Sequence, residues 1–162
     1  MWVGLFPQKW MFQRVLNSLL VWMYGPIISY HKMTLSGTNR PECFNHVVID
    51  DDSRRVGSTF TNHRCDRDLA EGWYRFINGN SMSTQCAKQH ACNTDYPGWL
   101  VSGHPTSSLS RYTRKVCFGK KSSSSSSCPC KYYTYIMVRH CGSFFVYKLK
   151  PTPRCHLRYC TT

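Results

Sequence analysis

The feature that most constrains this chain is its set of ten cysteines, all of which lie between residues 43 and 160. The same stretch holds fifteen Leu, Ile and Val and six Phe, about 18% of its residues, which is too few for a large aliphatic core. An even number of cysteines in such a segment indicates disulfides, each contributing roughly 2–4 kcal/mol to stability. We therefore predict a small, disulfide-rich, β-dominated fold with few short helices and five disulfides.

The cysteines also indicate where the protein resides, because disulfides persist only in oxidising compartments. We expect a secreted or extracellular protein in which residues 1–30 resemble a signal peptide, since Lys9 and Arg14 precede an apolar run. A signal anchor and a misassigned N-terminus stay open, although this run falls short of the roughly twenty apolar residues of a spanning helix. Residues 31–42 are expected to form a polar linker and residues 43–160 the folded module.

Short alternating segments between turn sequences predict the secondary structure. Residues 47–49 and 72–77 read as strands, and residues 133–138 and 144–149 as a hairpin. One short helix is expected at residues 65–70, where Asp66 could cap a turn. The serine run at residues 122–127 is too polar to pack and predicts a surface loop.

Charge is unevenly distributed along the chain. All eight acidic residues lie at or before Asp95, whereas residues 96–162 carry eleven Lys and Arg and no acid. A surface of one sign attracts polyanions such as sulfated glycans, although it can also serve solubility alone. The candidate polyanion-binding residues are Arg111, Arg114, Lys115, Lys120, Lys121, Lys148 and Lys150.

Patterns for catalysis or cofactor binding are weak. No C-x-x-C spacing supports a cysteine zinc site, so a reduced, zinc-binding intracellular protein is disfavoured. Residues 50–52 are three aspartates without the rest of a calcium loop, which indicates a turn or cap. Ser102 and His104 lack a G-x-S-x-G context, and no nucleic-acid-binding motif is present. We expect no catalytic residue, metal, cofactor or nucleic-acid partner; Trp99 is a candidate for stacking on a sugar ring.

The order of cysteines and aromatic blocks resembles a known extracellular module. The matching segments are Cys65-Asp66, residues 69–76 (L-A-E-G-W-Y-R-F), Cys86 with Cys92, residues 96–100 (Y-P-G-W-L), residues 103–105, Cys117, Cys128 with Cys130, residues 144–149 and residues 155–160. Together they are similar to the cysteine-rich module of uromodulin and the related pancreatic secretory-granule glycoprotein. The module also occurs in mosaic proteins with von Willebrand type D and EGF domains.

The resemblance implies a disulfide pairing that the spacing alone leaves open. The implied pairs are Cys43 with Cys141, Cys65 with Cys155, Cys86 with Cys128, Cys92 with Cys160, and Cys117 with Cys130. Pro129 separates Cys128 from Cys130, where the family usually has adjacent cysteines, so the pairing there is the least secure.

The function that the resemblance implies is a secreted, non-enzymatic recognition or adhesion module with a role in host defence. The family's mannose-rich decoy role is not carried over, because no N-x-S/T triplet occurs in the chain. The expected partner is an extracellular protein or glycan, and a fragment of a larger mosaic protein is the favoured origin. The alternative is a secreted binder of glycans or polyanions, such as glycosaminoglycans, that uses the basic C-terminal half.

Overall fold

The computed structural model describes residues 39–59, 63–77, 80–122 and 127–162. The signal-peptide-like segment (residues 1–30), most of the expected linker, part of the turn after residue 77 and the middle of the serine run lie outside the described residues. The folded unit spans Arg40–Thr162. No helix in the described part of the chain combines the length and the apolar character needed to cross a membrane.

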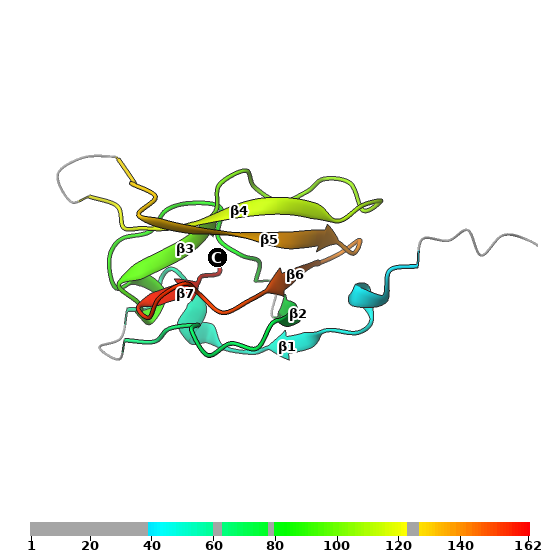
Figure 1. Cartoon of the computed structure of the whole chain (residues 1–162), viewed down its shortest axis with the longest axis horizontal. Coiled ribbons are helices and arrows are strands. Elements are labelled where there is room, and N and C mark those ends of the chain that lie inside the picture. Colours follow the sequence, from blue (N-terminus) through cyan, green and yellow to red (C-terminus); the bar gives the residue numbers. More distant parts are fainter. Residues whose placement is uncertain (1–38, 60–62, 78–79, 123–126) are drawn as a thin grey trace, which may run out of the picture. The chain divides into compact units, whose positions relative to one another are not determined.

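Seven strands form one sheet in the order β1-β2-β6-β5-β4-β3-β7 (Figure 1). Neighbouring strands run antiparallel except for the parallel pairs β1–β2 and β3–β7 at the two ends of this order. The strands are β1 (Val47–Ile49), β2 (Gly72–Phe76), β3 (Tyr96–Leu100), β4 (Tyr112–Phe118), β5 (Tyr132–His140), β6 (Phe145–Leu149) and β7 (Leu157–Tyr159).

The strands that alternate apolar and polar residues were predicted correctly. β1, β2 and the β5–β6 hairpin lie where the sequence placed them, and the β-dominated fold class is confirmed. β3, β4 and β7 were not predicted; β3 contains Pro97 and Gly98, two residue types that are depleted in strands. The helix expected at residues 65–70 is wrong, because this segment forms only a turn. The described helices are short 3-10 turns: η1 (Pro41–Cys43), η2 (Asp52–Arg54) and η3 (Ala91–Asn93).

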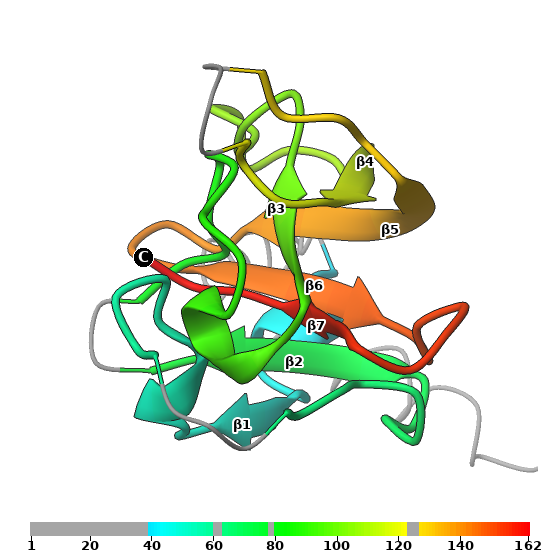
Figure 2. The same ribbon diagram turned by 90° about the vertical axis from the view of Figure 1, so that its left-hand side faces the viewer.

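The chain after β7 returns to the segment that follows β1. The Val56 amide donates to the carbonyl of Thr161 at 2.9 Å, and the Thr161 amide donates to the carbonyl of Arg54 at 2.8 Å. In Figure 2 the red C-terminal end accordingly runs past the segment after β1. Segments far apart in sequence therefore enclose one core.

The core is built from aromatic and aliphatic side chains in comparable numbers. Ring pairs such as Phe76–Tyr147 (5.4 Å between centroids) and Phe118–Tyr159 (5.6 Å) link strands across it. Trp99 is only 8% exposed, so the expectation that it stacks on a sugar ring is wrong. The core cluster comprises Tyr74, Phe76, Met82, Leu100, Val116, Phe118, Ile136, Val138, Tyr147, Leu149, Leu157 and Tyr159.

Four disulfides join the same cysteines as the family resemblance implies. Their Cα atoms lie 5.1–6.2 Å apart, in the usual range for a disulfide. The pairs are Cys43–Cys141, Cys86–Cys128, Cys92–Cys160 and Cys117–Cys130. The fifth expected pair is Cys65 and Cys155, whose Sγ atoms lie 2.7 Å apart and are not bonded in the structure. The fold therefore brings these two cysteines close enough for the bond that the resemblance implies.

Buried ion pairs form within the acidic N-terminal half of the folded unit and also between this half and the basic remainder. Asp66 is 3% exposed, and its carboxylate accepts two hydrogen bonds from Arg54, at 2.7 and 2.8 Å. Glu42 is 2% exposed and contacts the guanidinium groups of Arg111 and Arg139. The contacts of Glu42 correct the expectation of a C-terminal half of one sign, because two of its cations are paired with an acid from earlier in the chain.

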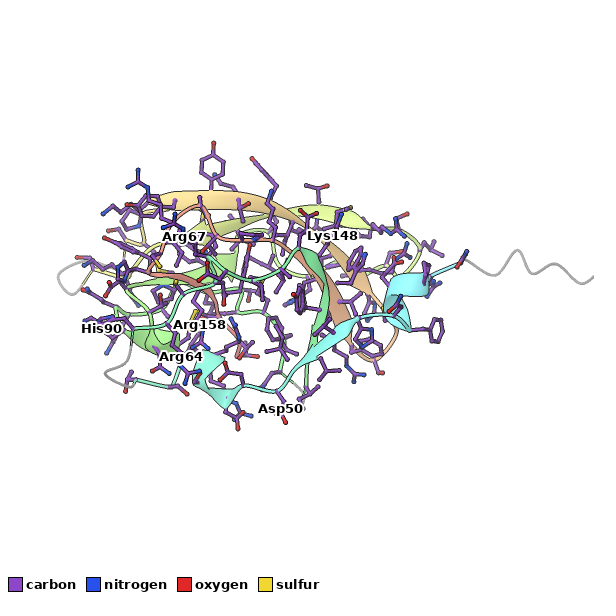
Figure 3. All side chains as sticks on the ribbon, turned by 60° about the horizontal axis from the view of Figure 1, so that its bottom comes forward. Asp50, Arg64, Arg67, His90, Lys148 and Arg158 are labelled. Carbon is purple, nitrogen blue, oxygen red and sulfur yellow. A yellow bond between two sulfur atoms is a disulfide. The ribbon has the colours of Figure 1, made fainter. Side chains whose placement is uncertain are left out.

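Arg158 is the largest side chain among the fully buried residues. Its guanidinium donates to Asp51 at 2.6 Å and to the Cys92 carbonyl at 2.9 Å, while burial lowers its pKa to about 10. Asp51 also caps η2 by accepting from the Ser53 amide at 3.1 Å, so the aspartate run does form a turn and cap. Figure 3 shows Arg158 with Arg64 and His90 at one end of the folded unit, away from Lys148.

A basic aromatic pocket as the candidate functional site

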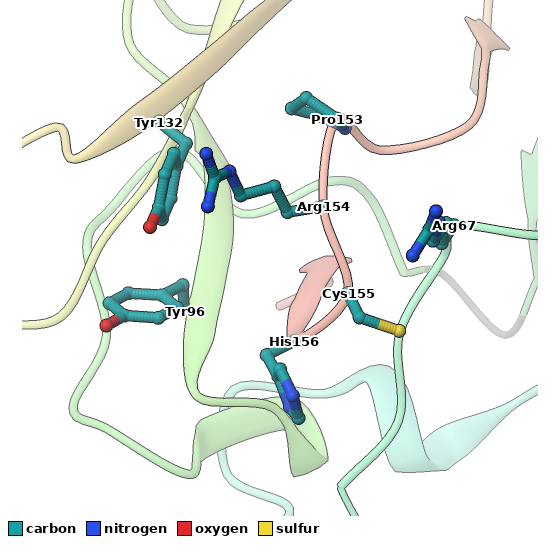
Figure 4. Close-up of a pocket in the computed structure, with 7 residues that line it drawn as sticks. All are labelled: Arg67, Tyr96, Tyr132, Pro153, Arg154, Cys155 and His156. Carbon is teal, nitrogen blue, oxygen red and sulfur yellow. The ribbon is translucent and has the colours of Figure 1, made fainter.

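A pocket of about 420 Å³ opens between the start of β3, the start of β5 and the loop before β7 (Figure 4). This volume falls within the range of small-molecule sites, about 300–1,000 Å³. None of its described lining residues carries a carboxylate side chain. These residues are Arg67, Tyr96, Tyr132, Pro153, Arg154, Cys155 and His156.

Strand register brings the two tyrosines of the pocket together. Phe118 on β4 pairs with Gly98 on β3 and with Tyr132 on β5, so the start of β5 lies two strands away from Tyr96. The rings of Tyr96 and Tyr132 meet edge to face, with centroids 5.5 Å apart and an interplanar angle of 85°. The parallel pairing of β3 with β7, in which Tyr96 faces Leu157, places the loop of residues 153–156 beside them.

Three cations surround this tyrosine pair. The Lys131 ammonium donates to the Tyr96 hydroxyl at 2.8 Å and lies 4.6 Å from the centre of that ring. The Lys120 ammonium lies 5.9 Å from the same centroid, and the Arg154 guanidinium lies 5.7 Å from that of Tyr132. All three are within reach of a cation–π contact. The hydrogen bond with Tyr96 raises the pKa of Lys131, which keeps this side chain charged at neutral pH.

Arg67 and Cys155 form the other side of the pocket in Figure 4, opposite the tyrosines. Arg67 follows Asp66, whose amide donates to the Leu157 carbonyl at 2.9 Å, so this turn is attached to β7. The pocket thus combines aromatic faces, two guanidinium groups and neighbouring ammonium groups, which suits an anionic ligand with a ring.

The structure does not gather the seven predicted polyanion-binding residues into one patch. Only Lys120 is placed next to the aromatic pair, and Arg111 and Lys148 are engaged by Glu42 and Glu71. Of the others, Arg114 donates to the Gly103 carbonyl, Lys115 covers the Tyr133 ring, Lys121 lines a second cavity, and the Lys150 carbonyl accepts from Tyr159.

Arg67, Lys131 and Arg154 were missed as candidate site residues. Lys131 stands directly before two tyrosines in sequence, a local signal that could have been noticed. Arg67 and Arg154 have no such local signal. They line the same pocket because the turn that carries Arg67 and the loop that carries Arg154 are both attached to β7.

The second cavity, of about 610 Å³, is a weaker candidate than the basic aromatic pocket. It is lined by small and polar residues from Val56 to Thr162 together with Lys88 and Lys121, and none of its described lining residues carries an aromatic ring. Aromatic side chains and convergent charged groups usually supply ligand specificity. The basic aromatic pocket therefore remains the better candidate.

The ring of His104 is engaged in packing and in hydrogen bonding. It stacks on Phe145 at 4.3 Å between centroids, and its Nε2 accepts from the Tyr147 hydroxyl at 2.9 Å. That hydroxyl in turn accepts from the Met82 amide at 3.0 Å. Burial lowers the pKa of His104 to about 4, so the ring is neutral at physiological pH and matches this hydrogen-bond chain.

Comparison with known proteins agrees with the family resemblance. The chain is 34% identical over 149 residues to the pancreatic secretory granule membrane major glycoprotein GP2 of Canis lupus familiaris, covering 90% of this chain and 28% of that protein. It is 35% identical to GP2 of Homo sapiens (74% and 22% covered) and 39% identical to uromodulin of Mus musculus (61% and 15%). The chain thus spans about a quarter of the length of the GP2 proteins.

These matches confirm the resemblance, and the disulfide-rich domain is an extracellular one. The model of a domain family described as "Uromodulin-like" matches residues 74–161, from β2 to the residue after the last cysteine. Because this match covers more than half of the chain, the chain belongs to the uromodulin-like family of cysteine-rich domains.

Proposed function

We propose that this domain is a non-enzymatic recognition module that binds an anionic saccharide, carboxylated or sulfated, in the basic aromatic pocket. The observation that carries the proposal is the Tyr96–Tyr132 pair surrounded by Lys120, Lys131 and Arg154. A fold that disulfides hold rigid suits an extracellular module of this family that recognises a partner.

The chemistry of the lining residues supports a sugar that carries negative charge. The apolar face of a sugar ring packs on an aromatic ring, and guanidinium groups bind carboxylate and sulfate oxygens in a bidentate manner. Arg154 and Arg67 offer two such groups on opposite sides of the pocket. A neutral sugar would leave both groups without a charged partner, so the charge of the ligand is part of the proposal.

The pocket is positioned by covalent and backbone constraints, which favours binding without large rearrangement. The Cys117–Cys130 disulfide holds β4 against the segment that leads to Lys131 and Tyr132. The Tyr96 amide donates to the His156 carbonyl at 3.0 Å and so ties β3 to the loop that carries Arg154. Arg154 itself is exposed, as a residue that contacts a ligand must be.

A second candidate function is contact with a protein partner through the outer face of β4 and β5. Tyr133 and Tyr135 are 57% and 53% exposed there, and their rings lie 5.9 Å apart beside Lys115. Tyrosine is enriched at the energetic centres of protein interfaces. This surface is the better choice for adhesion that does not involve sugars.

The saccharide proposal can be tested by calorimetric titration of the oxidised protein with a heparin-derived octasaccharide, with neutral dextran as the comparison ligand. Arg154→Gln should weaken binding about tenfold or more, because a hydrogen bond to a charged group contributes roughly 1.5–3 kcal/mol. The matched control is Arg55→Gln, which removes the same charge from an exposed residue that is paired with Asp52 and does not line the pocket.

Equal losses in the two variants would show that net charge alone attracts the ligand, and binding of dextran would show that anionic groups are not required. Either result would refute the proposal. Binding of octasaccharide should also weaken between low and high salt, since the contacts are exposed to solvent. If Tyr135→Ser abolished attachment to a protein partner while octasaccharide binding persisted, the two surfaces would have separate functions.

A further inference from the structure

We propose that His63, Asp95 and His156, with His90 beside them, form a binding site for a first-row transition-metal dication, for which Zn²⁺ is the probe. This inference does not depend on saccharide binding. It rests on a cluster of four side chains from separate segments of the chain, none of which was among the predicted site residues.

The three histidines converge on the Asp95 carboxylate. The Nδ1 atoms of His63 and His156 lie 3.3 Å from its Oδ1 and Oδ2, respectively, and the Nδ1 atom of His90 lies 3.6 Å from Oδ1. The ligand atoms of His63, Asp95 and His156 all lie within 4.8 Å of one another. The ring centroids of His63 and His90 are 5.6 Å apart, which puts the third histidine within reach after a small side-chain rotation.

These separations suit ligands around a common ion. Good hydrogen bonds between nitrogen and oxygen span about 2.7–3.2 Å, and the three distances to Asp95 are all longer. Zinc binds nitrogen and oxygen at about 2.0–2.2 Å in a tetrahedron, so two of its ligand atoms lie about 3.3–3.5 Å apart. The two shorter distances match this spacing, each to a different oxygen of Asp95, and separations of up to 4.8 Å among the ligand atoms would shorten when an ion is coordinated.

Backbone pairing, hydrogen bonds and a disulfide hold the segments that carry these side chains in place. The parallel pairing of β3 and β7 sets Asp95 next to His156, and the Thr94 hydroxyl donates to the His156 carbonyl at 2.8 Å. The Arg64 amide donates to the Asn93 carbonyl at 2.7 Å and so ties His63 to the same loop. His90 precedes η3, which the Cys92–Cys160 disulfide joins to the end of β7. The site is therefore largely organised before an ion arrives.

The donor set selects the class of ion. Imidazole nitrogen prefers Zn²⁺, Cu²⁺ and Ni²⁺, whereas Ca²⁺ requires six to eight oxygen ligands and finds a single carboxylate here. The side chains of His63 and His156 are 50% and 57% exposed, so an ion can enter from solvent. Arg67 and Arg154 line the neighbouring pocket with His156 and oppose a dication, so we expect moderate affinity.

The absence of C-x-x-C spacing disfavours only a cysteine zinc site, and this cluster is of a different kind. Its members are spread over the chain, from His63 in the segment before β2 to His156 directly before β7, so no local spacing indicates the site. All three histidines also have the Asp95 carboxylate as a neighbour, so this one group brings them together. The absence of a local sequence motif is therefore no argument against a histidine–aspartate site.

The experiment is calorimetric titration of the oxidised full chain, prepared without a histidine tag, with ZnCl₂ at constant pH. We expect one ion per chain, and at least about tenfold weaker binding in His63→Ala, since even outer-shell partners of a metal contribute roughly 10–100-fold. His156 has a left-handed backbone (φ 65°), so His156→Asn is the second variant, because asparagine tolerates this conformation. Its binding should fall similarly.

The matched control is His46→Ala, because His46 contacts the Glu42 carbonyl through its ring and lies outside the cluster. This variant should bind Zn²⁺ like the parent. Absence of zinc binding by the parent would show that the histidines only partner Asp95 and would overturn the proposal. Equal binding by the parent and both cluster variants, or an equally large loss in His46→Ala, would overturn it as well.

Discussion

Glu42 should make the stability of this domain sensitive to acid in a defined pH range. Its side chain is almost completely buried, and its carboxylate accepts hydrogen bonds from Arg111 at 2.8 and 3.0 Å. Arg139 approaches the same carboxylate with its side chain 8% exposed. The hydrogen bond with Arg111, aided by the charge of both guanidinium groups, lowers the pKa of Glu42 from 4.5 to about 2.

The magnitude follows from linkage between protonation and folding. The difference between 4.5 and about 2, at about 1.36 kcal/mol per pH unit, corresponds to about 3 kcal/mol of stability. Because the pKa in the folded state lies below the unfolded value, this stabilisation is complete above about pH 4.5. It is lost progressively as the pH falls towards 2, where the folded-state carboxylate becomes protonated.

The assay is urea denaturation of the parent and Glu42→Gln at constant ionic strength between pH 7 and pH 2, followed by tryptophan fluorescence. At pH 7 the variant should be less stable by about 3 kcal/mol or more, since it leaves Arg139 buried without its charged partner. This gap should close as the pH approaches 2. The control is Asp52→Asn, whose side chain is 70% exposed and should give no such pH dependence.

A gap between the parent and Glu42→Gln that stayed constant from pH 7 to pH 2 would refute the reasoning. The remaining acids titrate in both proteins, so they cancel in the difference as long as they do not contact Glu42. Such a constant gap would mean that the variant loses packing or hydrogen bonding and that the charge of Glu42 contributes nothing.

Two further predictions concern the sulfur pairing and the approach of strands. Peptide mapping without reduction should find Cys65 linked to Cys155, and replacing both by serine should cost roughly 2–4 kcal/mol; two free thiols in the oxidised protein would contradict this prediction. Gly98→Ala should cost roughly 1–3 kcal/mol in a thermal or urea melt, because a Cβ there would lie 2.6 Å from the Phe118 ring and 2.7 Å from the Arg158 carbonyl. Gly57→Ala has nothing within 4 Å and should change stability by less than about 0.5 kcal/mol; equal effects would disprove the steric argument.

The predicted and the missed strands differ in how local their signals are. β2 and the β5–β6 hairpin alternate large apolar and polar residues, and this pattern can be read within a few positions. β7 is three residues long and fully buried, and β3 carries Pro97 and Gly98. Neither has an alternating pattern; β7 becomes a strand by pairing with β3, and β3 by pairing with both β4 and β7.

The candidate site illustrates the same limit. Tyr96 belongs to one of the segments that resemble the family, but Arg154 was not chosen as a candidate, because nothing near it in sequence indicates a site. Lys120, by contrast, was chosen for its charge and does lie beside Tyr96. Arg111, also chosen for its charge, is occupied by Glu42, from which it is 69 residues distant.

Composition and short segments were enough to predict a cross-linked, β-dominated extracellular module, because the cysteine count, the scarcity of aliphatic residues and the alternating strands can all be read locally. The order of its cysteines and aromatic blocks was specific enough to identify the family. Which charges are neutralised, which remain available, and which rings and histidines meet became known from the folded chain alone. Those outcomes depend on strand register and on contacts between residues tens of positions apart, and no local pattern encodes them.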